Sequence, residues 1–249
     1  TSSMATVRGA VGERETLVNH QRNFFKTAVE EGSKAAGGWV FGDQTDDGRN
    51  GEFIDLLRRH RINTVQLNED ITLKGKEFKA GNAFYVPNDQ SQYRMVRTMF
   101  EQVTTFYDSI FYDASSWTTA LTYNMPYERY TGKSALKGKA IDDNYSGTTY
   151  GGVAKTNYAY LIEWDEYYSP KALYYLLEKG VYVNMGFKKF GIATNDGDKE
   201  FGYGTLMIPV ARQEVDADIL HAYIEEATEL AGIRAYSVKS GFSASGIDL

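Results

Sequence analysis

The sequence predicts an α/β fold of two similar halves, each with the order strand–helix–strand–strand–helix. Short apolar segments alternate with amphipathic ones, and their order repeats on either side of a polar stretch. Three of the four prolines stand where a strand should end or a helix should begin. Such alternation is typical of mostly parallel, twisted sheets covered by helices, and this is the arrangement that we expect.

The elements follow in order along the chain. Residues 12–31 are expected to form a helix, because the apolar residues there fall on one helical face: Leu17, Phe24, Phe25, Ala28 and Val29. The first half is predicted to contain a strand at 38–42, a helix at 52–60, strands at 62–67 and 83–86, and a helix at 92–103. The second half is predicted to contain a strand at 158–164, a helix at 170–179, strands at 181–185 and 205–208, a helix at 218–231, and a last strand at 233–238.

Residue matches between the halves indicate an internal duplication. The matched positions are Leu56-Leu57 with Leu176-Leu177, Phe78-x-x-Gly81 with Phe201-x-x-Gly204, and Pro87 and Gln90 with Pro209 and Gln213. Glycine suits a turn that leads into a strand, and proline ends a strand because it cannot donate to the ladder. The expected organisation is an N-terminal helical segment leaving a preceding domain (1–36), the first half (37–130), a polar linker (131–157) and the second half (158–249).

Composition excludes several classes of protein. The net charge of -6 removes the electrostatic footprint of a nucleic-acid binder, and no apolar run reaches the ~18 residues that span a bilayer. The absence of cysteine excludes disulfides, thiolate zinc sites and cysteine nucleophiles. The three histidines are far apart and lack metal-binding spacing, and no serine elbow is present, so we predict no catalytic and no metal-ligating residue in this chain.

One polar constellation remains as a candidate site. Acids follow the first strand of each half: Asp43, Asp46 and Asp47 with Arg49 in the first, and Glu163, Asp165 and Glu166 in the second. At the carboxyl ends of parallel strands they would line a polar or cation-binding crevice, or act as an acid–base pair. The alternative is that they cap exposed N–H groups at the start of the following helix.

A second candidate is an aromatic cluster near the end of the first half. Its members are Tyr112, Trp117, Tyr123 and Tyr127. These rings would form a stacking surface for a sugar or a peptide, or they would pack into the core or against a neighbouring domain. The sequence leaves both interpretations open.

Part of the chain resembles a known family. Residues 85–127 (YVPNDQSQYRMVRTMFEQVTTFYDSIFYDASSWTTALTYNMPY), with 39–53, 158–180 and 240–249, resemble a region of large bacterial zinc carboxypeptidases of the carboxypeptidase A-like family. In those proteins this region lies after the peptidase domain and before a class I glutamine amidotransferase-like domain. The family holds its zinc on an H-x-x-E pair and a later histidine, and no position here matches these ligands.

The resemblance implies a non-catalytic accessory region of a secreted or periplasmic metallocarboxypeptidase, with zinc in the parent peptidase domain and no cofactor in this chain. The implied partners are the parent's own peptidase and amidotransferase-like domains, and the implied role is that of an interdomain scaffold. The extracytoplasmic location comes from the resemblance alone, because the N-terminus lacks the apolar middle of a signal peptide. A peptide- or glycan-binding module is the first alternative, and an independent carboxylate-based hydrolase is the second.

Overall fold

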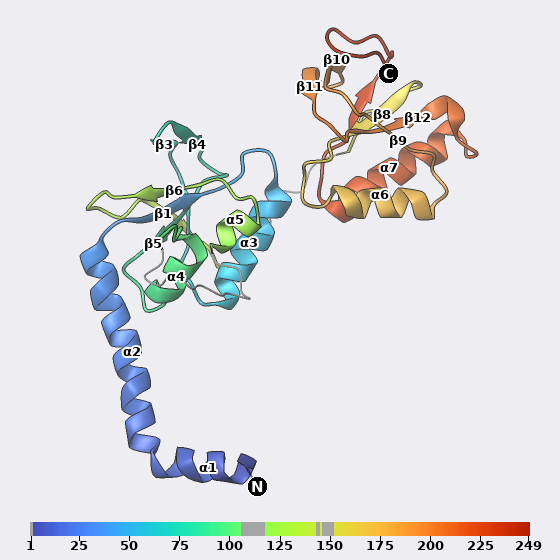
Figure 1. The fold of residues 1–249 in the computed structure, drawn as a ribbon. Coiled ribbons are helices and arrows are strands. Elements are labelled where there is room, and N and C mark those ends of the chain that lie inside the picture. The colour runs from blue at the N-terminus through green and yellow to red at the C-terminus, as the bar shows by residue number, and fades with distance from the viewer. Residues whose placement is uncertain (1, 106–117, 143–144, 146–151) are drawn as a thin grey trace. The chain divides into compact units, whose positions relative to one another are not determined.

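The chain contains two units that are each built on an antiparallel sheet (Figure 1). The computed structural model describes residues 2–105, 118–142, 145 and 152–249. The first unit comprises Thr1–Gln44 and Glu52–Tyr145, and the second comprises Thr45–Gly51 and Ser146–Leu249. None of the described helices is long and apolar enough to cross a membrane.

The sheet of the first unit has the strand order β6-β1-β5-β2-β7. In that order the strands are β6 (Tyr127–Tyr130), β1 (Gly38–Phe41), β5 (Phe84–Pro87), β2 (Val65–Leu67) and β7 (Gly138–Ala140). The register between β1 and β5 runs from Gly38 opposite Pro87 to Phe41 opposite Phe84. Strand β7 forms inside the polar stretch 131–157 and pairs with β2.

Both faces of this sheet are covered, one by helices and the other by a β-hairpin. Phe41 packs on the face that carries α3 (Asp47–Arg59), α4 (Tyr93–Phe100) and α5 (Thr119–Thr122). Val40 points to the other face, where it packs with Phe78 of the hairpin β3 (Ile71–Leu73) and β4 (Lys76–Phe78). Successive residues of β1 therefore serve two separate cores, as the alternation of a strand requires.

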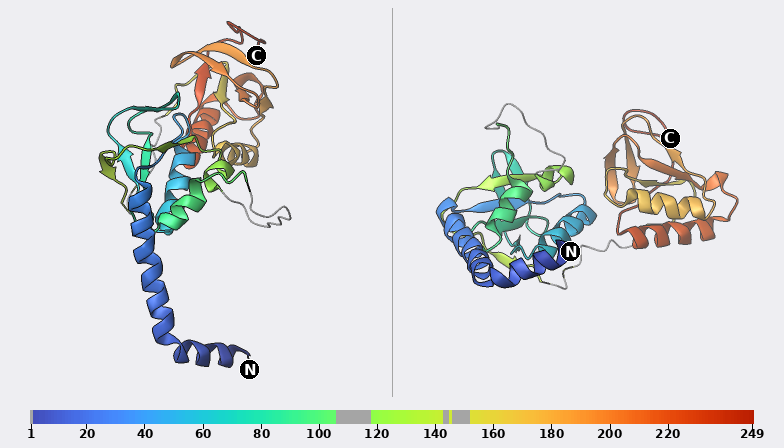
Figure 2. Two further views of the ribbon diagram at one scale, coloured as in Figure 1. Left: turned by 60° about the vertical axis from the view of Figure 1, so that its left-hand side comes forward. Right: turned by 60° about the horizontal axis from the view of Figure 1, so that its bottom comes forward.

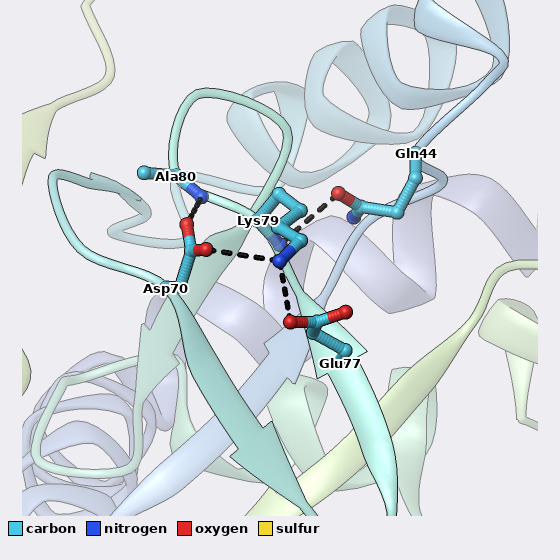
Figure 3. A network of polar contacts seen from close by, with 5 residues as sticks. All are labelled: Gln44, Asp70, Glu77, Lys79 and Ala80. Atoms are coloured by element: carbon cyan, nitrogen blue, oxygen red, sulfur yellow. Dashed lines mark hydrogen bonds and ion pairs between the residues drawn. The ribbon is translucent and has the colours of Figure 1, made fainter.

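The hairpin is tied down by an exposed polar network (Figure 3). The ammonium of Lys79 lies 3.1 Å from the carboxylate of Asp70 and also bonds to Glu77. The backbone N–H groups of Lys79 and Ala80 donate to Gln44 and Asp70 respectively. The hydrogen bonds of Asp70 with Ala80 and Lys79 lower its pKa, which is the sign expected for a carboxylate that holds a turn.

Two further helices precede the first sheet. Helix α1 (Ser2–Gly12) has no buried residue, and α2 (Arg14–Ala35) buries only Ala28 and Gly32 near its end. At Gly32 the helix packs against the backbone of Asn88, just after β5, so closely that a β-carbon at position 32 would lie 2.0 Å from the Asn88 carbonyl oxygen. Figure 2 shows α2 extending from the sheet of its unit with α1 at its far end.

The second unit repeats this architecture. Its sheet has the order β13-β8-β12-β9, with β13 (Tyr236–Val238), β8 (Ala159–Ile162), β12 (Leu206–Pro209) and β9 (Asn184–Met185). Tyr160 and Ile162 face the helices α6 (Ser169–Glu178) and α7 (Ala217–Ala231). Ala159 and Leu161 face the hairpin of β10 (Phe190–Thr194) and β11 (Gly197–Phe201). A short 3-10 turn, Val210–Arg212, follows β12.

The prediction of mostly parallel sheets is wrong, because every strand pair in the described residues is antiparallel. A strand–helix–strand crossover does exist: β1 and β2 run in the same direction, since both are antiparallel to β5. However, β5 inserts between them, which makes the unit a split β–α–β arrangement. The prediction failed because these strands are covered on both faces and are therefore continuous apolar segments, a sequence pattern that is typical of parallel sheets.

Four sheet strands and the hairpin of the first unit have counterparts in the second, as an internal duplication requires, while β7 has no counterpart among the described strands of the second unit. The order β6-β1-β5-β2 corresponds to β13-β8-β12-β9, and the hairpin lies at the same point of each chain order. Phe78 and Phe201 both end the second hairpin strand and are both almost fully buried. Each is preceded by a lysine and a glutamate, so the matched motif is longer than Phe-x-x-Gly.

Buried Gln90 and half-buried Gln213 make the same hydrogen bonds in the two units. Gln90 accepts from the N–H of Asn63 at 2.8 Å and donates to the carbonyls of Asn63 and Pro87. Gln213 accepts from the N–H of Tyr182 at 2.9 Å and donates to the carbonyls of Tyr182 and Pro209. In each unit one amide thus joins the residue before the second strand to the end of the third strand.

The leucine pair has to be realigned by one residue. The N–H of Ile62 donates to the carbonyl of Leu57 at 3.0 Å, and the N–H of Val181 donates to that of Leu176 at 3.0 Å. Leu57 and Leu176 are both fully buried, whereas Leu177 is 56% exposed. Leu57 therefore corresponds to Leu176, and Leu177 has no core role.

Replacing either glutamine should destabilise the chain to a similar extent. We expect Gln90→Ala and Gln213→Ala each to lower the free energy of unfolding by roughly 1–3 kcal/mol, because each leaves backbone groups without a partner. Urea denaturation followed by circular dichroism measures the change, and Gln21→Ala on the exposed face of α2 is the matched control. A large loss in one variant and none in the other would show that the two positions are not equivalent.

Candidate functional site

The second unit contains a polar junction where the segment Thr45–Gly51 meets the loop that follows β8. The carboxylate of Asp46 accepts the backbone N–H of Arg49 at 2.8 Å and that of Tyr167 at 2.7 Å. The guanidinium of Arg49 lies 3.2 Å from the same carboxylate and donates to the carbonyl oxygen of Asp165 at 2.7 Å. We call Asp46, Arg49, Glu163, Asp165 and Glu166 the acidic junction.

Glu166 is the buried carboxyl group of this junction. It is only 7% exposed, and burial, together with the nearby charges of Asp46 and Glu163, raises its pKa to about 8. A hydrogen bond from the backbone of Arg234 opposes this shift without cancelling it. At neutral pH the group is therefore mostly protonated in the folded chain.

Glu163, at the end of β8, is paired rather than open. Its carboxylate lies 3.0 Å from the ammonium of Lys199, which also lies over the ring of Tyr236 at 4.9 Å. Burial lowers the pKa of Lys199, but the hydrogen bond and the charge of Glu163 outweigh burial, and the net shift is upward. The ion pair joins β11 of the hairpin to the C-terminal end of β8, an inner strand of the sheet.

The other predicted site residues are distributed as follows. Asp43 is buried in the first unit after β1, and Asp47 is the buried first residue of α3. Tyr112 and Trp117 lie outside the described residues. Tyr123 packs on Phe53 with ring centroids 5.3 Å apart. The structure brings together Asp46, Arg49, Glu163, Asp165 and Glu166, and it does so through a loop contact and not through the carboxyl ends of parallel strands.

The first unit also contains a pocket that local sequence patterns do not predict. It has a volume of about 430 Å³ and an aromatic floor of Trp39, Phe100 and Tyr127. The rings of Trp39 and Phe100 are stacked with centroids 5.6 Å apart, and Tyr127 lies 5.8 Å from each of them. The volume is in the range of small-molecule sites. We call this feature the aromatic pocket.

The rim of the aromatic pocket is charged. The carboxylate of Glu128 lies 3.1 Å from the ammonium of Lys74 and 3.2 Å from that of Lys76. Burial raises the pKa of Glu128, but the hydrogen bonds from the two lysines outweigh burial and lower it overall. Arg129 lies 5.4 Å from the Trp39 ring and donates to the carbonyls of Gly38 and Ala36.

Sequence reasoning missed most of this pocket because four separate segments build it. Trp39 comes from β1, Lys74 and Lys76 from the hairpin, Phe100 from the end of α4, and the residues from Tyr127 to Arg129 from β6. Tyr127 is the one lining residue that the predicted aromatic cluster contains. In the described part of the chain, no group of three or more His, Asp or Glu side chains is arranged to hold a metal ion.

The raised pKa of Glu166 predicts a pH-dependent stability. The unfolded carboxyl ionises near its ordinary value of 4.5, whereas the folded one holds its proton up to about 8, so stability falls as pH rises between these values. Glu166→Gln should remove this loss, on the order of 1.4 kcal/mol for each pH unit. Urea unfolding at pH 5 and pH 8.5 measures it, with exposed Glu178→Gln as the control. A Glu166→Gln variant with the same pH slope as the parent chain would contradict the assignment.

No family model, no curated protein and no solved structure matches the chain at a significant level. The resemblance to the region that follows the peptidase domain in zinc carboxypeptidases therefore rests on the motifs of the sequence alone.

Proposed function

We propose that this chain is a non-catalytic accessory region of a secreted zinc metallocarboxypeptidase and acts as a scaffold between domains. The resemblance over residues 85–127 indicates the kind of longer protein to which the chain belongs, and one structural observation supports the scaffold role. This observation is the apolar face of α2 in the first unit, which the unit itself leaves largely uncovered.

Five large apolar side chains of α2 are exposed, namely Val29 and two pairs that lie seven residues apart. Leu17 and Val18 are 50% and 57% exposed, and Phe24 and Phe25 are 42% and 36% exposed. A seven-residue spacing keeps the pairs on one side of the helix over two turns. A helix that faces only solvent does not need such an apolar stripe, whereas a helix that packs against another helix does.

The end of α2 is held firmly, so the stripe has a defined position within its unit. The guanidinium of Arg94 in α4 donates to the carbonyl of Phe24 at 2.6 Å and to the carboxylate of Glu31 at 2.6 Å. It also lies over the ring of Phe24 at 4.4 Å. A helix anchored at one end and apolar along its exposed length is suited to joining a neighbouring domain, which the resemblance identifies as the peptidase domain.

The charged candidates also favour a structural role. Asp46 and Arg49 of the acidic junction are engaged with backbone groups, and Glu163 is engaged with Lys199. A carboxylate-based hydrolase has one feature in its favour, the raised pKa of Glu166. A binding module is favoured by a different feature, the aromatic pocket.

The scaffold proposal predicts that α2 becomes protected in the longer protein. Amide hydrogen exchange of residues 14–26 should be at least about ten-fold slower in the intact protein than in the 249-residue chain, because burial of the stripe adds about 1.4 kcal/mol or more to local opening. The measurement is exchange followed by mass spectrometry of peptic fragments, and α7 is the internal control that should not change.

A variant sharpens this test. Leu17→Ser with Phe25→Ser should return exchange in α2 of the intact protein toward that of the isolated chain. Thr16→Ser on the same helix should not. Equal exchange of residues 14–26 in the intact protein and in the chain would contradict the scaffold role.

A further inference from the structure

We propose that the aromatic pocket is a binding site for a small amphipathic carboxylate, meaning a carboxylate attached to an aromatic or aliphatic body. This inference goes beyond the scaffold role and does not depend on it. It rests on the shape, the lining and the charge of the pocket in the first unit.

The floor selects an apolar body. Trp39 presents aromatic surface to the pocket, and the buried side chains of Phe100, Tyr127 and Met125 belong to the same lining. Phe100 is fully buried, while Trp39 keeps part of its surface open to the pocket. An aromatic or branched aliphatic group entering here would gain the burial and the edge or stacked contacts that such rings favour.

The rim selects a negative charge. The ionisable groups of the lining are three cations, Lys74, Lys76 and Arg129, against two carboxylates, Glu101 and Glu128. Glu128 is shared between both lysines, so the three groups together keep one net positive charge. A surplus of positive charge at a pocket is notable in a chain whose net charge is -6.

Arg129 adds positive charge to the pocket, although we do not expect its guanidinium to contact the ligand directly. Its guanidinium hydrogen-bonds to backbone carbonyls, including those of Gly38 and Ala36, and these neutral acceptors leave its positive charge in place. Lys74 is the group best placed to bind a ligand, because its side chain is 73% exposed and its ammonium borders the opening. A carboxylate there would receive a charge-assisted hydrogen bond from a lysine that holds only a shared partner.

The pocket belongs to the first unit and has no counterpart by residue type in the second. Trp39 corresponds through the strand register to Tyr160, which is fully buried and bonded to His221. Arg129 lies opposite Trp39 in β6, whereas Ser237 lies opposite Tyr160 in β13. Lys76, by contrast, matches Lys199, and each pairs with a glutamate. Lys74 and Arg129 are therefore the cations specific to the pocket, and Lys76 is an anchor of the hairpin.

The test uses three probes with the full chain labelled with ¹⁵N in its tryptophans. N-acetylphenylalanine and acetyl-Gly-Gly-Phe carry the carboxylate, and N-acetylphenylalanine amide has the same apolar body without it. The indole signal of Trp39, assigned by its loss in Trp39→Phe, should shift on titration with both acids. The amide should bind at least about five-fold more weakly. Tighter binding of the tripeptide identifies a peptide end as the source of the carboxylate, and equal binding identifies a free acid.

Two variants distinguish binding in the pocket from non-specific attraction of the acids to surface lysines. Lys74→Gln should weaken binding of both acids about three- to ten-fold and leave the amide unchanged. Lys79→Gln removes a cation from the same hairpin outside the pocket and should change neither (Figure 3). Thermal unfolding of each variant shows that the fold is retained.

Three results would overturn the proposal. The first is the absence of any shift at Trp39 with the acids. The second is binding of the amide as tight as that of the acid. The third is equal loss of affinity in Lys74→Gln and Lys79→Gln, which would mean that the acids respond to surface charge and not to this pocket.

Discussion

Each unit depends on covering both faces of a small antiparallel sheet at once. Neighbouring residues of the first strand, Val40 and Phe41 or Leu161 and Ile162, belong to different cores. Helices cover one face and a two-stranded hairpin covers the other, and burial of both sets of side chains supplies the main driving force for the fold. The polar contacts act at the margins, where the glutamines and the hairpin lysines fix the covering elements to the ends of the strands.

This constraint explains what could be predicted from the sequence and what could not. Strands 38–42 and 158–164, the helices after them and the strand-ending prolines Pro87 and Pro209 follow from local patterns. Pairing did not follow, because apolar strands buried on both faces are typical of parallel sheets, and nothing local shows that the third strand enters between the first two. The sequence patterns predict no strands at 71–78 or 190–201, although the buried side chains of Phe78 and Phe201 attach these two hairpins to their sheets.

The candidate sites show the same limit. The acids after the first strands were found by their position, but their expected convergence assumed a parallel sheet. In the second unit, Asp46 and Glu166 come together because the segment Thr45–Gly51 bonds to the loop after β8. The aromatic pocket does not follow from residue spacing, since Trp39 and Lys74 lie 35 positions apart in the chain and enter its lining from different elements. Comparing the two units adds information here, because features that one unit lacks are not needed by the shared fold.

The central claim is that both units are copies of one split antiparallel arrangement, and nuclear Overhauser contacts between Cα protons of the labelled chain test it most directly. The account predicts contacts from β5 to both β1 and β2 and from β12 to both β8 and β9, in opposite strand directions, with residues near Gly38 meeting those near Pro87 and residues near Ala159 meeting those near Pro209. Contacts that join β1 directly to β2, or β8 directly to β9, in the same direction would contradict it.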